Sequence, residues 1–180
     1  MNKKRYIGIF CSAKDTIPQK YFDDAIVASS ICAKKGYSLL YGGDRVGLMG
    51  CVSRTFLEYG QSVIGICTKR MYAEKKYAQY CNRIIVVEDL KQRKDEMILK
   101  ADVLLILPGG IGTLDEFFSA ITMKDLGYIF KKIVLVNVDS FYSDLLCLLN
   151  KFSDQHFLKK DYHELFDIVN CVEELNEVLQ

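Results

Sequence analysis

Short apolar runs alternate with longer amphipathic stretches through most of the chain, and this alternation restricts the possible folds more than any other feature of the sequence. The runs are rich in Ile, Val and Leu, as strands buried on both faces are. Strands and helices at this spacing form βαβ units with right-handed crossovers. The sequence therefore predicts an α/β fold with a parallel sheet and helices on both faces. The predicted strands are Tyr6–Cys11, Ser38–Tyr41, Ser62–Cys67, Arg83–Val87, Val103–Leu107 and Ile133–Asn137.

Apolar residues at helical spacing fill the intervals between these strands. The sequence shows no internal repeat, low-complexity tract or linker, so residues 1–180 are interpreted as a single domain. Thr68–Asn82 is too long and polar for a tight connection, and we interpret it as a mobile flap or a partner surface. The predicted helices are a first one that follows Pro18 and includes 22–32, then Leu48–Tyr59, Leu90–Ala101, Leu114–Leu126, 141–150 and 172–179.

The overall composition excludes several broad classes of protein. With 24 Lys and Arg against 23 Asp and Glu, the net charge is +1, so binding to nucleic acid or membranes through bulk charge is not expected. No apolar run reaches the roughly 18–20 residues of a membrane helix, and the start of the chain lacks the apolar region of a signal peptide. Seven cysteines without a C-x-x-C pair, and two histidines outside any zinc motif, indicate a reduced cytoplasmic protein without a metal site.

Two glycine-rich turns, residues 41–50 and 107–116, each follow a predicted strand and open a predicted helix. Ligands of open α/β sheets bind beyond the carboxyl ends of the strands. Glycines there let backbone N–H groups approach an anion closely, and the helix N-terminus adds unpaired donors. Neither turn has P-loop or G-x-G-x-x-G spacing. The alternative for each segment is a tight turn that binds no ligand. Two such turns in one small sheet favour a binding site for the phosphate of a mononucleotide or a sugar phosphate.

Charged residues occur where the start of a helix does not favour them. Asp89 and Gln92 have the spacing of a capping box at the helix that begins at Leu90. Arg93 lies on the same face as Leu90 and Met97, at spacings of three and four, so a cation is predicted to point inward near the positive end of the helix. This placement indicates an anion in front of Arg93. The alternative is a solvated arginine that extends past the core.

Two acids, Asp115 and Glu116, follow the second glycine-rich turn. Thr113-x-x-Glu116 has the spacing of a capping box, so capping alone would account for Glu116. Carboxylates repel phosphate, however, and two of them suit a reaction that develops positive charge, such as glycosidic cleavage. Both interpretations stay open at this point.

Three motifs together resemble the LONELY GUY family of cytokinin riboside 5′-monophosphate phosphoribohydrolases, long mislabelled as lysine decarboxylases. LPGGIGTLDE at 107–116 matches P-G-G-x-G-T-x-x-E, residues 41–50 resemble Y-G-G-G-x-x-G-L-M-G, and residues 93–97 resemble R-K-x-x-M. The resemblance runs from Ile7 to about Leu149. It implies a Rossmann-like fold, a homodimer and no cofactor. The implied reaction is hydrolysis of the N-glycosidic bond of a nucleoside 5′-monophosphate, AMP or N6-substituted AMP, to the free base and ribose 5-phosphate.

The resemblance also assigns roles to individual residues. The arginine of R-K and the second acid after P-G-G-x-G-T are catalytic in the family, and these positions are Arg93 and Glu116. Asp44 departs from the family by replacing the third glycine of Y-G-G-G, and Asp115 by replacing a glutamate. The implied substrate-binding residues are Ser12, Gly43, Glu74, Lys94, Gly109, Gly110, Ile111, Gly112, Thr113, Asp115 and Thr122.

Two other functions are alternatives to this hydrolysis, a nucleotide sensor and an amino-acid decarboxylase. A non-catalytic nucleotide sensor would bind through the same turns and signal through residues 68–82, but the catalytic acid argues against it. An amino-acid decarboxylase would need a lysine Schiff base to pyridoxal phosphate, and nothing in the sequence resembles that arrangement.

The helix 114–126 and its exit carry more apolar residues than one βα unit needs, which predicts an interface and agrees with the homodimer. These residues are Ile121, Met123, Leu126, Tyr128, Ile129 and Phe130.

Overall fold

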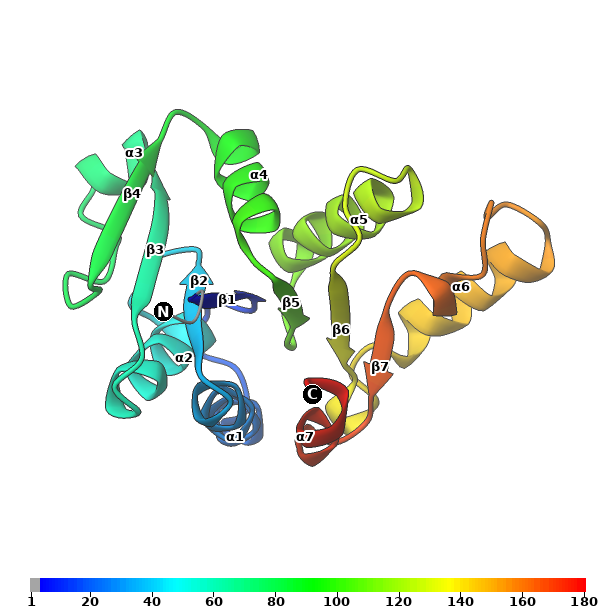
Figure 1. Ribbon diagram of the computed structural model, residues 1–180, viewed down its shortest axis with the longest axis horizontal. Coiled ribbons are helices and arrows are strands. Elements are labelled where there is room, and N and C mark those ends of the chain that lie inside the picture. The colour runs from blue at the N-terminus through cyan, green and yellow to red at the C-terminus, as the bar shows by residue number, and fades with distance from the viewer. Residues whose placement is uncertain (1–3) are drawn as a thin grey trace.

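The computed structural model describes residues 4–180 and arranges their seven strands in one sheet (Figure 1). The strands are β1 (Arg5–Phe10), β2 (Tyr37–Tyr41), β3 (Val63–Thr68), β4 (Arg83–Val87), β5 (Val103–Ile106), β6 (Lys132–Val136) and β7 (Asp167–Val169). Their order across the sheet is β4-β3-β2-β1-β5-β6-β7, and every neighbouring pair is parallel. The predicted parallel sheet is confirmed.

Helices cover both faces of this sheet, as the sequence predicts. The helices are α1 (Gln19–Lys34), α2 (Gly47–Glu58), α3 (Lys69–Ala73), α4 (Leu90–Lys100), α5 (Ile111–Asp125), α6 (Ser143–Asp154) and α7 (Leu175–Val178). In Figure 1, α1, α2 and α7 lie on one side of the sheet, and α4, α5 and α6 on the other. The chain builds β1 to β4 in one direction and then returns to β5. Right-handed crossovers therefore place the later helices on the opposite face.

Each face of the sheet has its own apolar core, because alternate residues of a strand point to opposite sides. In β1, Ile7 and Ile9 belong to the core beneath α1 and α2, whereas Phe10 belongs to the core beneath α4 and α5. Burial on both faces accounts for the nearly continuous apolar runs of the central strands.

The structure differs from the predicted elements at four places in particular. α3 has five residues and β7 has three, which is too short for a periodic pattern to reveal either of them. The predicted helix 172–179 is a 3₁₀ turn at Val172–Glu174 followed by α7. α5 begins at Ile111, earlier than the predicted Leu114, because Gly110 takes the N-cap position. Because α5 starts three residues early, Asp115 and Glu116 lie in its second turn and not at its start.

The polar segment Thr68–Asn82 packs against the first glycine-rich turn. Ala78 is fully buried, and its N–H donates to the carbonyl of Gly43 at 2.8 Å. The rings of Tyr72 and Tyr77 stack with their centroids 4.8 Å apart. These contacts anchor part of a segment that the sequence predicts to be a flap or a partner surface.

Candidate functional site

A cleft of about 280 Å³ opens at the carboxyl edge of the sheet, where ligands of open α/β folds bind. β1 and β5 are neighbours in the sheet, so the loops that follow them meet there. The N–H of Ser12 donates to the carbonyl of Pro108 at 3.2 Å. This contact joins the first loop to the second glycine-rich turn. The cleft is lined by Cys11, Ser12, Ala13, Lys14, Met49, Arg93, Gly110, Ile111, Gly112, Thr113 and Glu116.

The N-terminus of α5 forms one wall of this cleft and offers unpaired N–H donors. Its N-cap is Gly110, whose backbone is extended and which supplies no side-chain cap. A side chain at Gly110 or Gly112 would meet no neighbour within 4 Å, so both positions are open. Gly109 is constrained instead, because a Cβ there would lie 2.1 Å from the Thr113 hydroxyl oxygen. An uncapped helix start with this much space is suited to an anion.

The capping interpretation of Glu116 is wrong. Because α5 begins at Ile111, Thr113 lies inside the first turn and Glu116 in the second, instead of at the N-cap and N3 positions. Glu116 is buried, with 6% of its surface exposed. Capping therefore does not explain this buried carboxylate, and its partner lies on another helix.

That partner is Arg93, in the first turns of α4. Its Nη1 lies 3.4 Å from Oε1 of Glu116. Its Nε donates to the carbonyl of Ile66 at 2.9 Å, and its Nη2 to the carbonyl of Gly42 at 3.0 Å. A Cβ at Gly42 would lie 1.8 Å from Nη2, so only glycine leaves room for the guanidinium. Arg93 is thus fixed by the ends of β2 and β3, and the alternative of a solvated arginine is wrong.

The start of α4 confirms only part of the predicted capping box. Oδ1 of Asp89 accepts from the N–H of Gln92 at 2.8 Å, as expected. The side chain of Gln92, however, accepts from the N–H of Glu88, and not from that of Asp89. Asp89 still fixes the start of the helix, which turns Arg93 inward.

Burial raises the pKa of Glu116 from 4.5 to about 7. The guanidinium of Arg93 opposes this rise, and the nearby Asp115 adds to it. Glu116 is therefore poised to exchange a proton near neutral pH. Burial, with a further contribution from Glu116, also raises the pKa of Cys11 well above its ordinary value. The thiol of Cys11 consequently stays protonated and is a poor nucleophile.

A second ion pair joins the same two helices at the rim of the cleft. Nζ of Lys94 donates to both carboxylate oxygens of Asp115, at 2.8 and 2.9 Å. The Asp115 side chain is 63% exposed, so this pair contributes little to stability. It nevertheless places a cation and an anion next to the buried Arg93–Glu116 pair.

Six of the eleven implied substrate-binding residues do not line the cleft. Lys94, Gly109 and Asp115 lie beside it, whereas Gly43, Glu74 and Thr122 lie elsewhere. Gly43 has a φ of +79° and shapes the first glycine-rich turn. Glu74 ends α3, where hydrogen bonds from Arg70 and then Lys76 lower its pKa to about 2. Thr122 lies on the exposed side of α5. The other five implied residues line the cleft.

The cleft also contains residues that sequence reasoning missed. Met49 lies in it because α2 starts directly beneath the loop after β1, and its N–H donates to the carbonyl of Ser12 at 3.2 Å. The only signal for Met49 was its place in the Y-G-G-G-x-x-G-L-M-G motif. Lys14 also lines the cleft.

A small apolar hollow of about 200 Å³ adjoins the cleft and shares Ser12 and Gly110 with it. Its wall includes Tyr21 and Phe141, whose rings meet edge to face at 5.4 Å. Gly109 lines this hollow and not the cleft itself.

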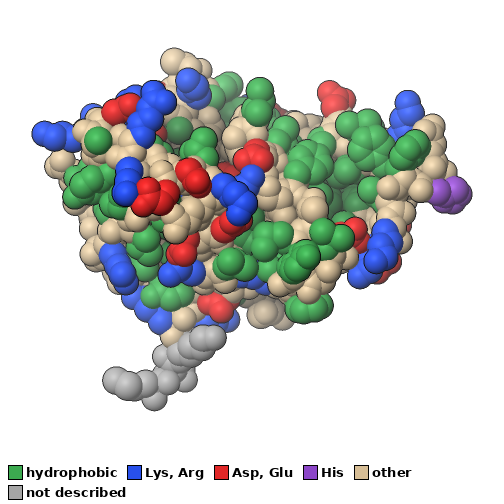
Figure 2. Space-filling view, turned by 90° about the horizontal axis from the view of Figure 1, so that it is seen from above, with side chains coloured by type: hydrophobic (Ala, Val, Ile, Leu, Met, Phe, Trp, Pro, Cys, Tyr) green, Lys and Arg blue, Asp and Glu red, His purple; other side chains and the backbone are tan. Residues whose placement is uncertain are grey.

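The outer face of α5 and its exit present a stripe of exposed apolar side chains. Figure 2 looks onto the side of the molecule formed by α4, α5 and α6, where apolar side chains lie exposed among charged ones. Ile121 and Ile129, which the sequence assigns to an interface, are buried in the core instead. The exposed members of the stripe, called the α5 stripe below, are Ile111, Phe118, Leu126, Tyr128 and Phe130.

Residues 4–180 contain no group of three or more His, Cys, Asp or Glu side chains placed to hold a metal ion. None of their helices is both long enough and apolar enough to cross a bilayer.

Solved structures with this fold include the molybdenum cofactor binding protein of Rippkaea orientalis. It is 22% identical, its TM-score is 0.75, and the match covers 99% of this chain and 97% of that one. The molybdenum cofactor carrier protein of Chlamydomonas reinhardtii is 20% identical with a TM-score of 0.74, covering 98% of this chain and 96% of that one. At these identities the likeness establishes the Rossmann-like fold alone.

Sequence relatives identify the family. The family model described as a possible lysine decarboxylase matches residues 49–179. A cytokinin riboside 5′-monophosphate phosphoribohydrolase of Arabidopsis thaliana is 32% identical over 99% of this chain and 83% of its own length. A second one from the same plant is 35% identical over 86% of this chain and 72% of its own length. The chain therefore belongs to the LONELY GUY family of phosphoribohydrolases that its three motifs resemble.

Proposed function

We propose that this protein hydrolyses the N-glycosidic bond of adenosine-type nucleoside 5′-monophosphates, AMP or N6-substituted AMP, to the free base and ribose 5-phosphate. The observation that carries the proposal is the Arg93–Glu116 pair, buried beside the uncapped N-terminus of α5. The names of the relatives, which describe this reaction on cytokinin riboside 5′-monophosphates, support it.

The 5′-phosphate binds at the start of α5. The N–H groups of residues 110–113 point from an uncapped helix end, where the helix dipole favours a dianion. Because Gly109 has no side chain, Thr113 can pack against the glycine-rich turn and maintain the shape of that turn. Ser12 and Lys14 line the opposite side of the cleft, and Lys14 adds a cation.

The bond breaks next to Glu116. As the bond between C1′ and the base lengthens, positive charge develops on the ribose, and the carboxylate of Glu116 stabilises this charge or positions the attacking water. Water supplies a hydroxyl group to C1′, and its other proton leaves with the base. Asp115, one residue earlier, adds negative potential at the rim. The reaction uses no cofactor and no metal.

Arg93 orients this machinery. Its Nε and Nη2 donate to backbone carbonyls, and this fixes Nη1 next to Glu116. Arg93 also lines the cleft. Such a clamp fixes the carboxylate in the orientation that the transition state needs. Lys94 contributes a cation at the rim, paired with Asp115.

We further propose that two copies of the chain associate through the α5 stripe. The stripe exposes large apolar side chains, of which Phe130 is 87% exposed and Tyr128 73% exposed. Thr122 lies on the same outer side of α5, so a contact with substrate would require a neighbouring chain. Gly43 and Glu74, on the first glycine-rich turn and α3, complete the proposed substrate-binding set. Light scattering at micromolar concentration tests this proposal, and a monomer alone would contradict it.

We propose that residues 1–180 act as one domain in the cytoplasm. All seven cysteines are free thiols, four of them buried, which fits a reducing compartment.

Incubation of the purified protein with AMP and with N6-isopentenyl-AMP, in the presence of EDTA, tests the reaction. Chromatography should detect free base and ribose 5-phosphate in equal amounts. Adenosine should react far more slowly, because it lacks the phosphate that binds at α5. Inorganic phosphate as the only product, or carbon dioxide from lysine, would contradict the proposal. Tight AMP binding without cleavage would identify a nucleotide sensor instead.

A further inference from the structure

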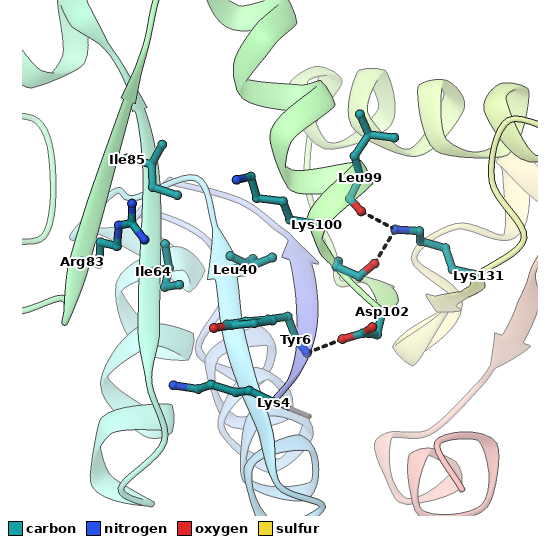
Figure 3. A pocket seen from close by; sticks show the side chains of 11 residues that line it. Lys4, Tyr6, Leu40, Ile64, Arg83, Ile85, Leu99, Lys100, Asp102 and Lys131 are labelled. Atoms are coloured by element: carbon teal, nitrogen blue, oxygen red, sulfur yellow. Dashed lines mark hydrogen bonds between the residues drawn. The ribbon is translucent and has the colours of Figure 1, made fainter. Parts of the chain in front are cut away.

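A second and larger cavity, of about 570 Å³, lies at the amino edge of the sheet, opposite the cleft (Figure 3). It is bounded by the last turn of α4 and by the strands β1 to β4. α4 crosses the sheet from β4 towards β5 and leaves this part of the sheet face uncovered. The volume falls in the range of small-molecule sites, about 300–1,000 Å³.

The cavity combines an apolar floor with a cationic rim. The floor consists of side chains from four adjacent strands and from α4, namely Tyr6, Leu40, Ile64, Ile85 and Leu99. The rim carries four cations, Lys4, Arg83, Lys100 and Lys131. Figure 3 shows Arg83 and Lys100 on opposite sides of the cavity, with their charged ends directed towards one another.

The positive charge of this rim is largely uncompensated within the cavity. Arg83 makes no ion pair with any of residues 4–180. Lys100 pairs with Glu96 at 3.0 Å, but Glu96 does not line the cavity. The single lining acid, Asp102, accepts the N–H of Tyr6 at 2.7 Å. An anion between Arg83 and Lys100 would therefore meet one cation without an ion pair among the described residues and one that shares a carboxylate, while Asp102 is engaged with the backbone of β1.

The C-terminus of α4 ends at this cavity, and its carbonyls would normally repel an anion. Here Lys131 cancels that effect, since its Nζ donates to the carbonyls of Ile98, Leu99 and Ala101. Figure 3 shows the ammonium group lying at the helix end. The negative end of the helix is thus neutralised where the cavity begins.

We propose that this cavity binds a small amphipathic anion, with an apolar aromatic or aliphatic body and one anionic group. The body lies on the sheet floor, and the anionic group lies between Arg83 and Lys100. Charged hydrogen bonds from a guanidinium and an ammonium suit a carboxylate, sulfonate or phosphate. The site is separate from the cleft, so it stands whether or not the chain cleaves nucleotides.

A fluorescent probe of this chemistry is 1-anilinonaphthalene-8-sulfonate, which has an aromatic body and one sulfonate. It is titrated into the Glu116→Gln protein, which should bind AMP without cleaving it, in the presence of excess AMP so that the cleft is occupied. We expect saturable binding that AMP does not displace. Arg83→Glu combined with Lys100→Glu should weaken binding about tenfold or more, since two attractions become repulsions. The control is Arg54→Glu, an exposed arginine on α2 that lies outside the cavity, which should leave binding unchanged.

The floor and the sign of the charge are tested separately. Leu99→Ser removes an apolar wall at a position that is 57% exposed, and Leu148→Ser on α6 is its control at 46% exposed. Octanoate should displace the probe, whereas octylammonium, with a similar aliphatic body and the opposite charge, should not. Unchanged affinity in the Arg83→Glu, Lys100→Glu protein, or equal displacement by the two octyl compounds, would overturn the proposal.

Discussion

Two ion pairs join α4 to α5 through consecutive residues, yet their surroundings differ sharply. Lys94 and Asp115 meet at 2.8 Å, with the Lys94 side chain 19% exposed and the Asp115 side chain 63% exposed. Arg93 and Glu116 meet at 3.4 Å, and their side chains are 11% and 8% exposed. The Lys94–Asp115 pair has the shorter contact, whereas burial raises the pKa of the Glu116 carboxyl to about 7. The contact distance therefore does not indicate which ion pair matters more to the free energy, because the loss of hydration dominates the energy of the buried pair.

The difference arises from helix geometry. Consecutive residues of a helix point about 100° apart, so one residue of each helix faces the core while its neighbour lies at the rim, with Lys94 half-buried and Asp115 exposed. Arg93 and Glu116 take the inward positions. Three substitutions, one control substitution and one pH series test whether burial accounts for the difference in function between the two pairs.

The largest effect is expected for Arg93→Ala. It leaves Glu116 buried without a cation and removes donors from the carbonyls of Gly42 and Ile66. Loss of one partner of a buried pair costs about 3–5 kcal/mol of unfolding free energy. We expect turnover to be lost and AMP binding to weaken together. Urea denaturation and calorimetric titration measure both, and a stable, active Arg93→Ala protein would remove the clamp from the mechanism.

Glu116→Gln keeps the shape of the side chain and removes its charge. The loss of about 3–4 kcal/mol of transition-state stabilisation lowers kcat about 10²- to 10³-fold. We expect the melting temperature to stay within a few degrees and AMP still to bind. Asp115→Asn is the matched control on the exposed pair and should retain much more activity. Near-normal turnover in a folded Glu116→Gln protein would exclude a catalytic role for this carboxylate.

The buried pair should also give the protein a characteristic pH dependence. Because the folded state raises the pKa of Glu116 from 4.5 to about 7, it favours the protonated acid. The stability contribution is therefore fully present below pH 4.5 and is lost as pH rises through 7, by up to about 3 kcal/mol. We expect the unfolding free energy of the wild type to fall relative to Glu116→Gln between pH 5 and 8. Over the same range kcat/KM should rise with an apparent pKa near 7. A flat difference in stability would contradict the burial argument.

The smallest effect is expected for Lys94→Ala. An exposed ion pair contributes about 0–1 kcal/mol, so the unfolding free energy should change by no more than that. Chemical denaturation in low and high salt measures the change, which should shrink as salt increases. A loss as large as that of Arg93→Ala would show that exposure does not distinguish the two pairs.

The sequence by itself determines the fold class, because strands buried on both faces of a sheet are nearly continuous runs of apolar residues. The apolar runs of β1 to β6 are visible without any structure, as are the two glycine-rich turns. Helical spacing with Met97 also predicts the inward direction of Arg93. Local patterns of this kind involve residues close together in the chain, so periodicity reveals them.

Tertiary structure alone decided what Arg93 and Glu116 meet. The start of α5 at Ile111 turned an apparent capping residue into a buried acid, and the ends of β2 and β3 supplied carbonyls for the guanidinium. The cationic cavity at the amino edge likewise joins residues from four strands and a helix. Contacts of this kind depend on how segments distant in sequence pack together, and the raised pKa of Glu116 follows from the loss of water that this packing causes.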